Sequence, residues 1–99
     1  MYVVVSHTIK NPEVASSRGE RLISGEGAPE GVRVLQFYMA KDADRAACLW
    51  ESPSTNAVQE YVDTTLGDSS SNEVYEIDAE QSFSERPLGL AASAPVSQT

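Results

Sequence analysis

Two side chains of this sequence could carry chemistry that few others can, and each occurs once. His7 and Cys48 are the only histidine and the only cysteine among 99 residues. His7 interrupts the apolar residues Val3, Val5 and Ile9. An imidazole in this position could bind a ligand, act as a general base or donate a hydrogen bond to a substrate. It could equally be a buried histidine whose nitrogens are satisfied by a carbonyl or a carboxylate, as polar groups in protein interiors usually are.

Cys48 lies in the segment "RAACLWE", which is apolar on both of its alternating sides. A nucleophilic cysteine needs a lowered pKa, and an apolar setting raises the pKa instead. We therefore expect Cys48 to pack rather than react. The aromatic residues Trp50 and Tyr38 are expected to form walls of a core, an interface or a binding site.

Metal binding has little support from the residue types. A transition-metal site usually needs several histidine, cysteine or carboxylate ligands, so one chain is not expected to build a complete site. A metal shared by His7 of two copies stays open as an alternative. The acidic residues near the end, among them Glu73, Glu76 and Asp78, alternate as expected for solubility at a sheet edge. The sequence contains no phosphate-binding loop, nucleophile elbow or dinucleotide fingerprint.

The hydrophobic pattern and the turn residues predict which elements hold these side chains. Asn11 and Pro12 look like a helix start, and Ser52 and Pro53 repeat that signature. Gly67 is expected to end the second helix. The predicted order is strand 2–9, helix 12–24, strand 32–41, strand 45–51, helix 53–66 and strand 72–79.

This order predicts an α+β protein with the ferredoxin-like βαββαβ fold. Such a fold has a four-stranded antiparallel sheet with both helices on one face. We expect one domain over residues 1–83. Residues 84–99 are small and polar with two prolines, and they predict a flexible C-terminal tail.

The predicted strands are apolar on both faces, which is unusual for a sheet with one solvated side. The second strand illustrates this, because alternation places one apolar set opposite another: Val32, Val34 and Tyr38 against Leu35, Phe37 and Met39. An exposed sheet face of this kind normally marks an interface. The pattern therefore predicts a homodimer in which two sheets pack face to face as a dimeric α/β barrel.

The topology makes strands 2–9 and 45–51 antiparallel neighbours. Centring one on the other places His7 opposite Ala46, and it also pairs Val5 with Cys48 and Val3 with Trp50. The first helix has few bulky side chains, so a cavity between helix and sheet is expected. The predicted ligand-binding residues are Val5, His7, Tyr38, Cys48 and Trp50.

The formal net charge of −8 argues against nucleic acid and against an anionic membrane surface as partners. The start "MYVVVSHTIK" does not follow the pattern of a secretion leader, and no apolar run is long enough to span a bilayer. A single cysteine also excludes an intrachain disulfide. The expected location is cytoplasmic.

The segments "YVVVSHTIKNPE", "GVRVLQFYMAKDADRAACLWESPSTNAVQEYV" and "SSNEVYEIDAE" resemble the dimeric α/β-barrel superfamily. Within it they resemble small bacterial proteins of unknown function, related to antibiotic-biosynthesis monooxygenases, stress-responsive barrels and nickel-binding barrels. This resemblance implies a homodimer that binds a small ligand. Its alternatives are a cofactor-independent monooxygenase or cyclase for a small apolar or aromatic substrate, with His7 as the catalytic residue, and a nickel-binding protein. A module that only binds a partner is a fourth reading. The sequence predicts no particular cofactor.

Overall fold

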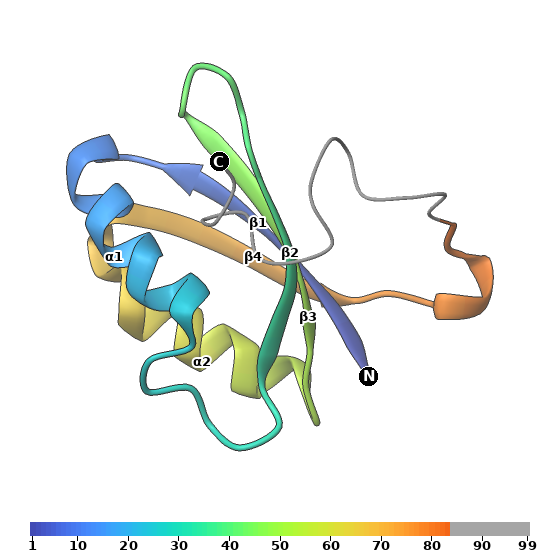
Figure 1. Ribbon diagram of the computed structural model, residues 1–99. Helices are drawn as coiled ribbons and strands as arrows, with labels where there is room; N and C mark the ends of the chain where they lie inside the picture. The colour runs from blue at the N-terminus through green and yellow to red at the C-terminus, as the bar shows by residue number, and fades with distance from the viewer. Residues whose placement is uncertain (84–99) are drawn as a thin grey trace.

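Strands and helices follow one another in the predicted order in the computed structural model, which describes residues 1–83 (Figure 1). The tail predicted for 84–99 lies outside the described residues. The elements are β1 (Tyr2–Ile9), α1 (Pro12–Ser24), β2 (Arg33–Met39), β3 (Arg45–Glu51), α2 (Thr55–Leu66), η1 (Gly67–Ser69), β4 (Ser70–Glu76) and η2 (Ala79–Gln81).

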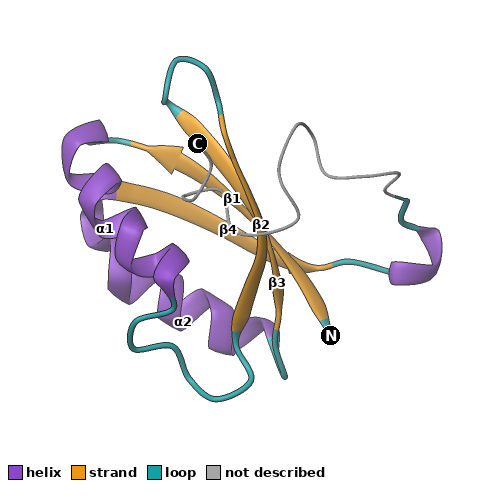
Figure 2. Cartoon of the chain, viewed as in Figure 1, coloured by secondary structure: helices purple, strands orange, loops and turns teal. Residues whose placement is uncertain are grey.

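The four strands form one antiparallel sheet in the order β2-β3-β1-β4, and both helices cover the same face of it (Figure 2). Strands β1 and β3 are central because each helix crossover skips one strand, which places β2 beyond β3 and β4 beyond β1 at the two edges. The predicted ferredoxin-like α+β fold is confirmed. The sheet face away from the helices is called the open face below.

Helix α1 begins and ends where the sequence predicts. The side chain of Asn11 accepts a hydrogen bond from the backbone N–H of Val14 (3.3 Å), and Pro12 occupies the first helical position. Gly25 ends the helix with a φ of 82°, a conformation that glycine adopts without strain.

The later boundaries differ from the prediction. Ser54, not Ser52, caps α2 by accepting a hydrogen bond from Ala57 N–H (3.0 Å). Ser52 instead donates its hydroxyl hydrogen to the carbonyl of Ser54 (2.8 Å) and so shapes the turn before the helix. Strand β4 runs over Ser70–Glu76 instead of 72–79, since η1 ends early enough for Ser70 to pair with β1.

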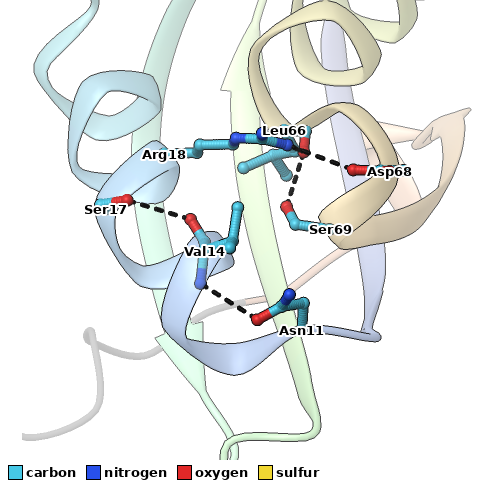
Figure 3. A network of polar contacts seen from close by, with 7 residues as sticks. All are labelled: Asn11, Val14, Ser17, Arg18, Leu66, Asp68 and Ser69. Atoms are coloured by element: carbon cyan, nitrogen blue, oxygen red, sulfur yellow. Dashed lines mark hydrogen bonds and ion pairs between the residues drawn. The ribbon is translucent and has the colours of Figure 1, made fainter.

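Arg18 joins the two helices (Figure 3). From α1 it reaches the end of α2, where its Nη1 donates to the carbonyl oxygen of Leu66 (2.9 Å). The same nitrogen lies 3.4 Å from the carboxylate of Asp68. The last carbonyls of a helix have no partner within the helix and carry partial negative charge, so a guanidinium here stabilises the end of α2.

The core lies between the sheet and α2. Trp50 and Tyr61 meet edge to face at its centre, with ring centroids 5.9 Å apart at 83°. The phenol of Tyr61 donates to the carbonyl of Glu26 (2.8 Å) and so also holds the loop after α1. The buried apolar residues are Val3, Val5, Leu22, Val32, Cys48, Trp50, Val58, Tyr61, Val62 and Leu66.

A β-bulge in β2 changes which residues face the helices. Val34 pairs with Trp50, but the next pair joins Gln36 to Leu49, so Leu35 is an extra residue in β2. The extra residue turns the rest of the strand over, which places Tyr38 on the open face. The predicted faces of β2 are therefore wrong from the bulge onward.

Among residues 1–83, no helix has the length and apolar character that a membrane crossing requires.

Candidate functional site

The register predicted for the two central strands is confirmed. His7 lies opposite Ala46, Val5 opposite Cys48 and Val3 opposite Trp50. Paired residues of neighbouring strands point to the same face, so these side chains all point toward the helices. Four of the five predicted site residues therefore come together on the helix side: Val5, His7, Cys48 and Trp50. Tyr38 does not join them, because it pairs with Ala47 on the open face.

His7 uses both of its ring nitrogens. Nδ1 lies 2.8 Å from Oδ1 of Asn72 in β4, and Nε2 lies 2.8 Å from Sγ of Cys48 in β3. An amide oxygen can only accept, so Nδ1 carries the hydrogen and Nε2 is the acceptor in the neutral ring. The thiol of Cys48 donates its hydrogen to Nε2. The imidazole is thus held in one tautomer and one orientation.

Asn72 is itself fixed by its neighbours. Its Nδ2 donates to Oδ1 of Asp63 in α2 (2.9 Å), and its Oδ1 also accepts from the hydroxyl of Ser70. Gln59 donates to the other oxygen of Asp63 (2.9 Å) and to the backbone carbonyl of Asn72 (3.2 Å). A hydrogen-bonded chain therefore runs from Cys48 through His7 and Asn72 to Asp63, linking three strands to α2.

Neither Asn72 nor Asp63 was identified from the sequence. The signal for Asn72 was only partial: the topology pairs β1 with β4, but centring the predicted strand 72–79 on strand 2–9 places Val74 opposite His7, whereas the observed register places Asn72 there. Asp63 carried no such signal. It lies on a helix, and its distance from β4 depends on how that helix packs.

Burial keeps both members of the His7–Cys48 pair neutral. Desolvation lowers the pKa of His7 below its ordinary value of 6.5, although the hydrogen bond to Asn72 acts in the opposite direction. Desolvation raises the pKa of Cys48 to about 12, against a weaker opposing effect of Trp50. The pair is therefore a thiol and a neutral imidazole, which agrees with the expectation that Cys48 is not a nucleophile.

The indole nitrogen of Trp50 is the one buried side-chain polar atom of residues 1–83 without a hydrogen-bond partner. Trp50 is fully buried and follows Cys48 by two positions on the same face of β3. The indole N–H lies near enough to Cys48 to lower the pKa of the thiol slightly. The distance and angle between the two groups nevertheless fall outside the limits of a hydrogen bond. An unpaired buried N–H costs about 1–3 kcal/mol. An acceptor that reached this atom would therefore bind favourably.

Fewer side chains pack over the helix side of the sheet beside His7 than over its centre. The helix-side row that contains His7 continues through Ala46 to Met39, and Met39 is 48 % exposed although it faces the helices. Helix α1 buries only Leu22, and a methyl group added at Gly19 would meet no atom outside the helix within 4 Å. The small side chain of Ala46 thus separates buried His7 from the exposed end of β2 at Met39.

Two hollows on the described surface lie away from this site. One of about 490 Å³ is bounded by Met1, Tyr2 and residues 76–80, and one of about 610 Å³ lies between residues 30–33 and Glu51 with Pro53. His7 lines neither of them, and with Cys48 it is nearly closed to solvent. The predicted cavity between α1 and the sheet is therefore not one of these two hollows.

The described residues bring together no group of three or more histidine, cysteine or acidic side chains that could hold a metal ion. His7 and Cys48 alone could supply two metal ligands, and Nε2 of His7 and Sγ of Cys48 are already hydrogen-bonded to each other.

The open face is apolar at its centre. Tyr2, Tyr75 and Leu35 expose 41 %, 50 % and 37 % of their surfaces. Its charged residues are two arginines and two glutamates, Arg33, Arg45, Glu51 and Glu73, so the face is neutral although the whole chain carries −8.

No protein-family model matches the sequence, and no curated protein gives a significant match. The structure is similar to that of Rv0793 from Mycobacterium tuberculosis, with a TM-score of 0.52 over 82 % of this chain and 98 % of that chain. The similarity establishes the fold. At 17 % sequence identity it shows nothing further.

Proposed function

We propose that this protein is a homodimer that binds a small, largely apolar ligand on the helix side of its sheet, beside His7. One observation carries the proposal: the indole N–H of Trp50 is buried without a partner, next to the polar chain that starts at Cys48. Small-molecule sites are mostly apolar with a few placed polar groups. Trp50 supplies a donor, and Val5 and Phe37 supply apolar surface.

The chemistry of the ligand follows from this donor. A flat molecule with one acceptor oxygen would pair with Trp50 Nε1, and its apolar part would enter over Ala46. A small movement of α1 makes the space, because this helix holds the sheet with few large side chains.

The experiment uses two probes of almost equal shape. Acetophenone carries a carbonyl acceptor and ethylbenzene does not. We expect acetophenone to raise the melting temperature in proportion to the logarithm of its concentration, as a binder of the native state does. It should also shift the indole N–H resonance of Trp50, which is unique because the chain has one tryptophan.

The matched variant is Trp50→Phe, which keeps an aromatic ring and removes the donor. It should weaken acetophenone binding about tenfold, the equivalent of one hydrogen bond, and leave ethylbenzene binding nearly unchanged. If neither probe changes the melting temperature or the Trp50 resonance of the wild-type protein, the proposed ligand site does not exist.

The homodimer rests on the open face. Its apolar centre would be a sizeable exposed patch on a monomer, and its neutral charge lets two acidic chains approach there. Sedimentation should show a dimer that Tyr75→Asp dissociates. Glu20→Lys, on the exposed side of α1, is the control and should leave the dimer intact.

A cofactor-independent monooxygenase or cyclase is a second candidate, because His7 is held with Nε2 as an acceptor. A general base needs this arrangement within hydrogen-bond reach of its substrate, and Cys48 would have to rotate away to admit one. Oxygen uptake with an electron-rich phenol, abolished in His7→Gln, would support it. Equal rates for the two proteins would remove it.

A further inference from the structure

The chain after β4 forms an arm, residues 77–83, whose hydrogen bonds to the body are confined to its start, while residues 76–80 border a hollow beside Met1 and Tyr2. The backbone N–H of Ile77 still donates to the carbonyl of Tyr2 (3.0 Å). Beyond that point, the hydrogen bonds that the arm makes to residues 1–83 stay within the arm. Asp78 accepts from the backbone of Glu80 (3.0 Å) and from the side chain of Gln81 (3.1 Å). The arm is thus a locally braced turn that stands away from sheet and helices (Figure 1).

This arm ends the described chain with an aromatic side chain that contacts little. Phe83 is 89 % exposed, the highest value among the exposed large apolar residues. Burying a phenyl ring removes a large apolar surface from water, which favours a docked arm.

We propose that the arm docks on a second copy of this chain, where Phe83 packs against the open face of the partner. This inference rests on the homodimer of the proposed function and adds a second element to its interface. A two-fold axis repeats each contact. Each Phe83 ring would therefore cover the exposed open face of the other copy, and the dimer would contain this contact twice.

Charge complementarity favours a second copy as the occupant. The arm carries the two acids Asp78 and Glu80 and no base. The open face presents Arg45, which forms no ion pair with any residue from 1 to 83. It also presents Arg33, which is 70 % exposed while paired with Glu51. An acidic arm therefore meets arginines at the edge of an apolar face.

The first experiment places a reporter on the arm. In Phe83→Trp, the added indole should emit at long wavelength in dilute protein and shift to shorter wavelength as the dimer forms. Trp50 is buried throughout and contributes a constant background. Sedimentation of the same samples gives the dimer dissociation constant, so the spectral shift and the assembly can be compared directly.

The second experiment measures the contribution of the contact. Because Phe83 is exposed, Phe83→Ala should fold normally and weaken the dimer at least tenfold. Arg45→Glu should weaken it as well, and adding Glu80→Lys should recover part of the loss. Arg21→Glu, an exposed change on α1, is the matched control and should have no effect.

The outcomes separate this inference from the proposed function. A stable dimer with an unchanged dissociation constant in Phe83→Ala, together with concentration-independent emission of the indole added in Phe83→Trp, would overturn the arm contact alone. A wild-type protein that stays monomeric would overturn both the arm contact and the dimer, and the acetophenone experiment would still decide the ligand site.

Discussion

Nε2 of His7 and Sγ of Cys48 lie 2.8 Å apart in the interior of the protein, and both groups are neutral. In cysteine nucleophiles the same two residue types form a thiolate and an imidazolium. Here burial works against both charges. The pair therefore acts as a hydrogen-bonded element of the core, and its neutrality leads to measurable consequences.

The first consequence is a pH dependence of stability. The folded protein lowers the pKa of His7 below 6.5, so the unfolded chain binds the proton first as the pH falls. We expect the free energy of unfolding to decrease below about pH 6.5, with a slope of at most about 1.4 kcal/mol per pH unit. Urea unfolding at several pH values measures it.

His7→Gln is the control, since glutamine at position 7 has no group that titrates. The difference in stability between the two proteins should change with pH between 5 and 7. The carboxylates contribute equally to both proteins and cancel. A constant difference over this range would mean that His7 has the same pKa folded and unfolded.

The second consequence concerns the reactivity of Cys48. With a pKa of about 12 and almost no exposure, the thiol should react with iodoacetamide at pH 8 only when the structure opens. Labelling should thus be slower than in denaturant by orders of magnitude. A Ser16→Cys variant provides an exposed thiol on α1 for comparison. Equal rates at both positions would contradict the buried pair.

Asn72 should determine the tautomer of His7. Nitrogen NMR of the imidazole is expected to show hydrogen on Nδ1 and none on Nε2 in the wild-type protein. Asn72→Leu removes the acceptor and leaves Nδ1–H buried without a partner, at a cost of about 1–3 kcal/mol. Asp63→Asn should have a smaller effect, because an amide oxygen can still accept from Asn72. A wild-type spectrum with hydrogen on Nε2 would rule out the chain of hydrogen bonds from Cys48 to Asp63.

The end of α2 offers a test of the Arg18 contact. Gly67 has a φ of 58°, and a Cβ there would lie 2.8 Å from Nη1 of Arg18. Its ψ of −137° puts it in a region that glycine alone occupies freely, so Gly67→Ala should cost about 1–3 kcal/mol in backbone strain. It should also displace Arg18 from the carbonyl of Leu66. Gly25→Ala is the milder comparison, since φ of 82° and ψ of 11° lie in the left-handed helical region and a Cβ there meets no atom within 4 Å. Thermal unfolding compares the two.

A double-mutant cycle isolates the second part of that loss. In an Arg18→Ala background, Gly67→Ala should cost less than it does in the wild-type protein, because the guanidinium it displaces is already absent. Additive effects of Arg18→Ala and Gly67→Ala would show that the arginine moves aside freely and contributes little.

Much of the fold could be predicted from alternation and from the signals at element ends. Asn11 with Pro12, and Gly67 after α2, marked boundaries that the structure confirms. The pairing of His7 with Ala46 also followed, because two strands of similar length in this topology have one favourable alignment.

The errors came from features that local patterns do not encode. The extra residue at Leu35 reversed the faces of β2, so Tyr38 left the predicted site. Similarly, Ser52 and Ser54 both suit a helix cap, and only the path of the turn decided between them.

The sequence by itself determined the order of the elements, the face that His7 shares with Val5 and the face that Cys48 shares with Trp50, because periodicity along single strands sets which side chains share a face. Centring the two strands on each other then gave the register that the structure confirms. Only the tertiary structure decided that Asn72 and Asp63 continue the polar chain from His7. A hydrogen bond between strand and helix requires atoms about 3 Å apart, and that closeness is set by how α2 packs on the sheet, which no spacing along the chain specifies.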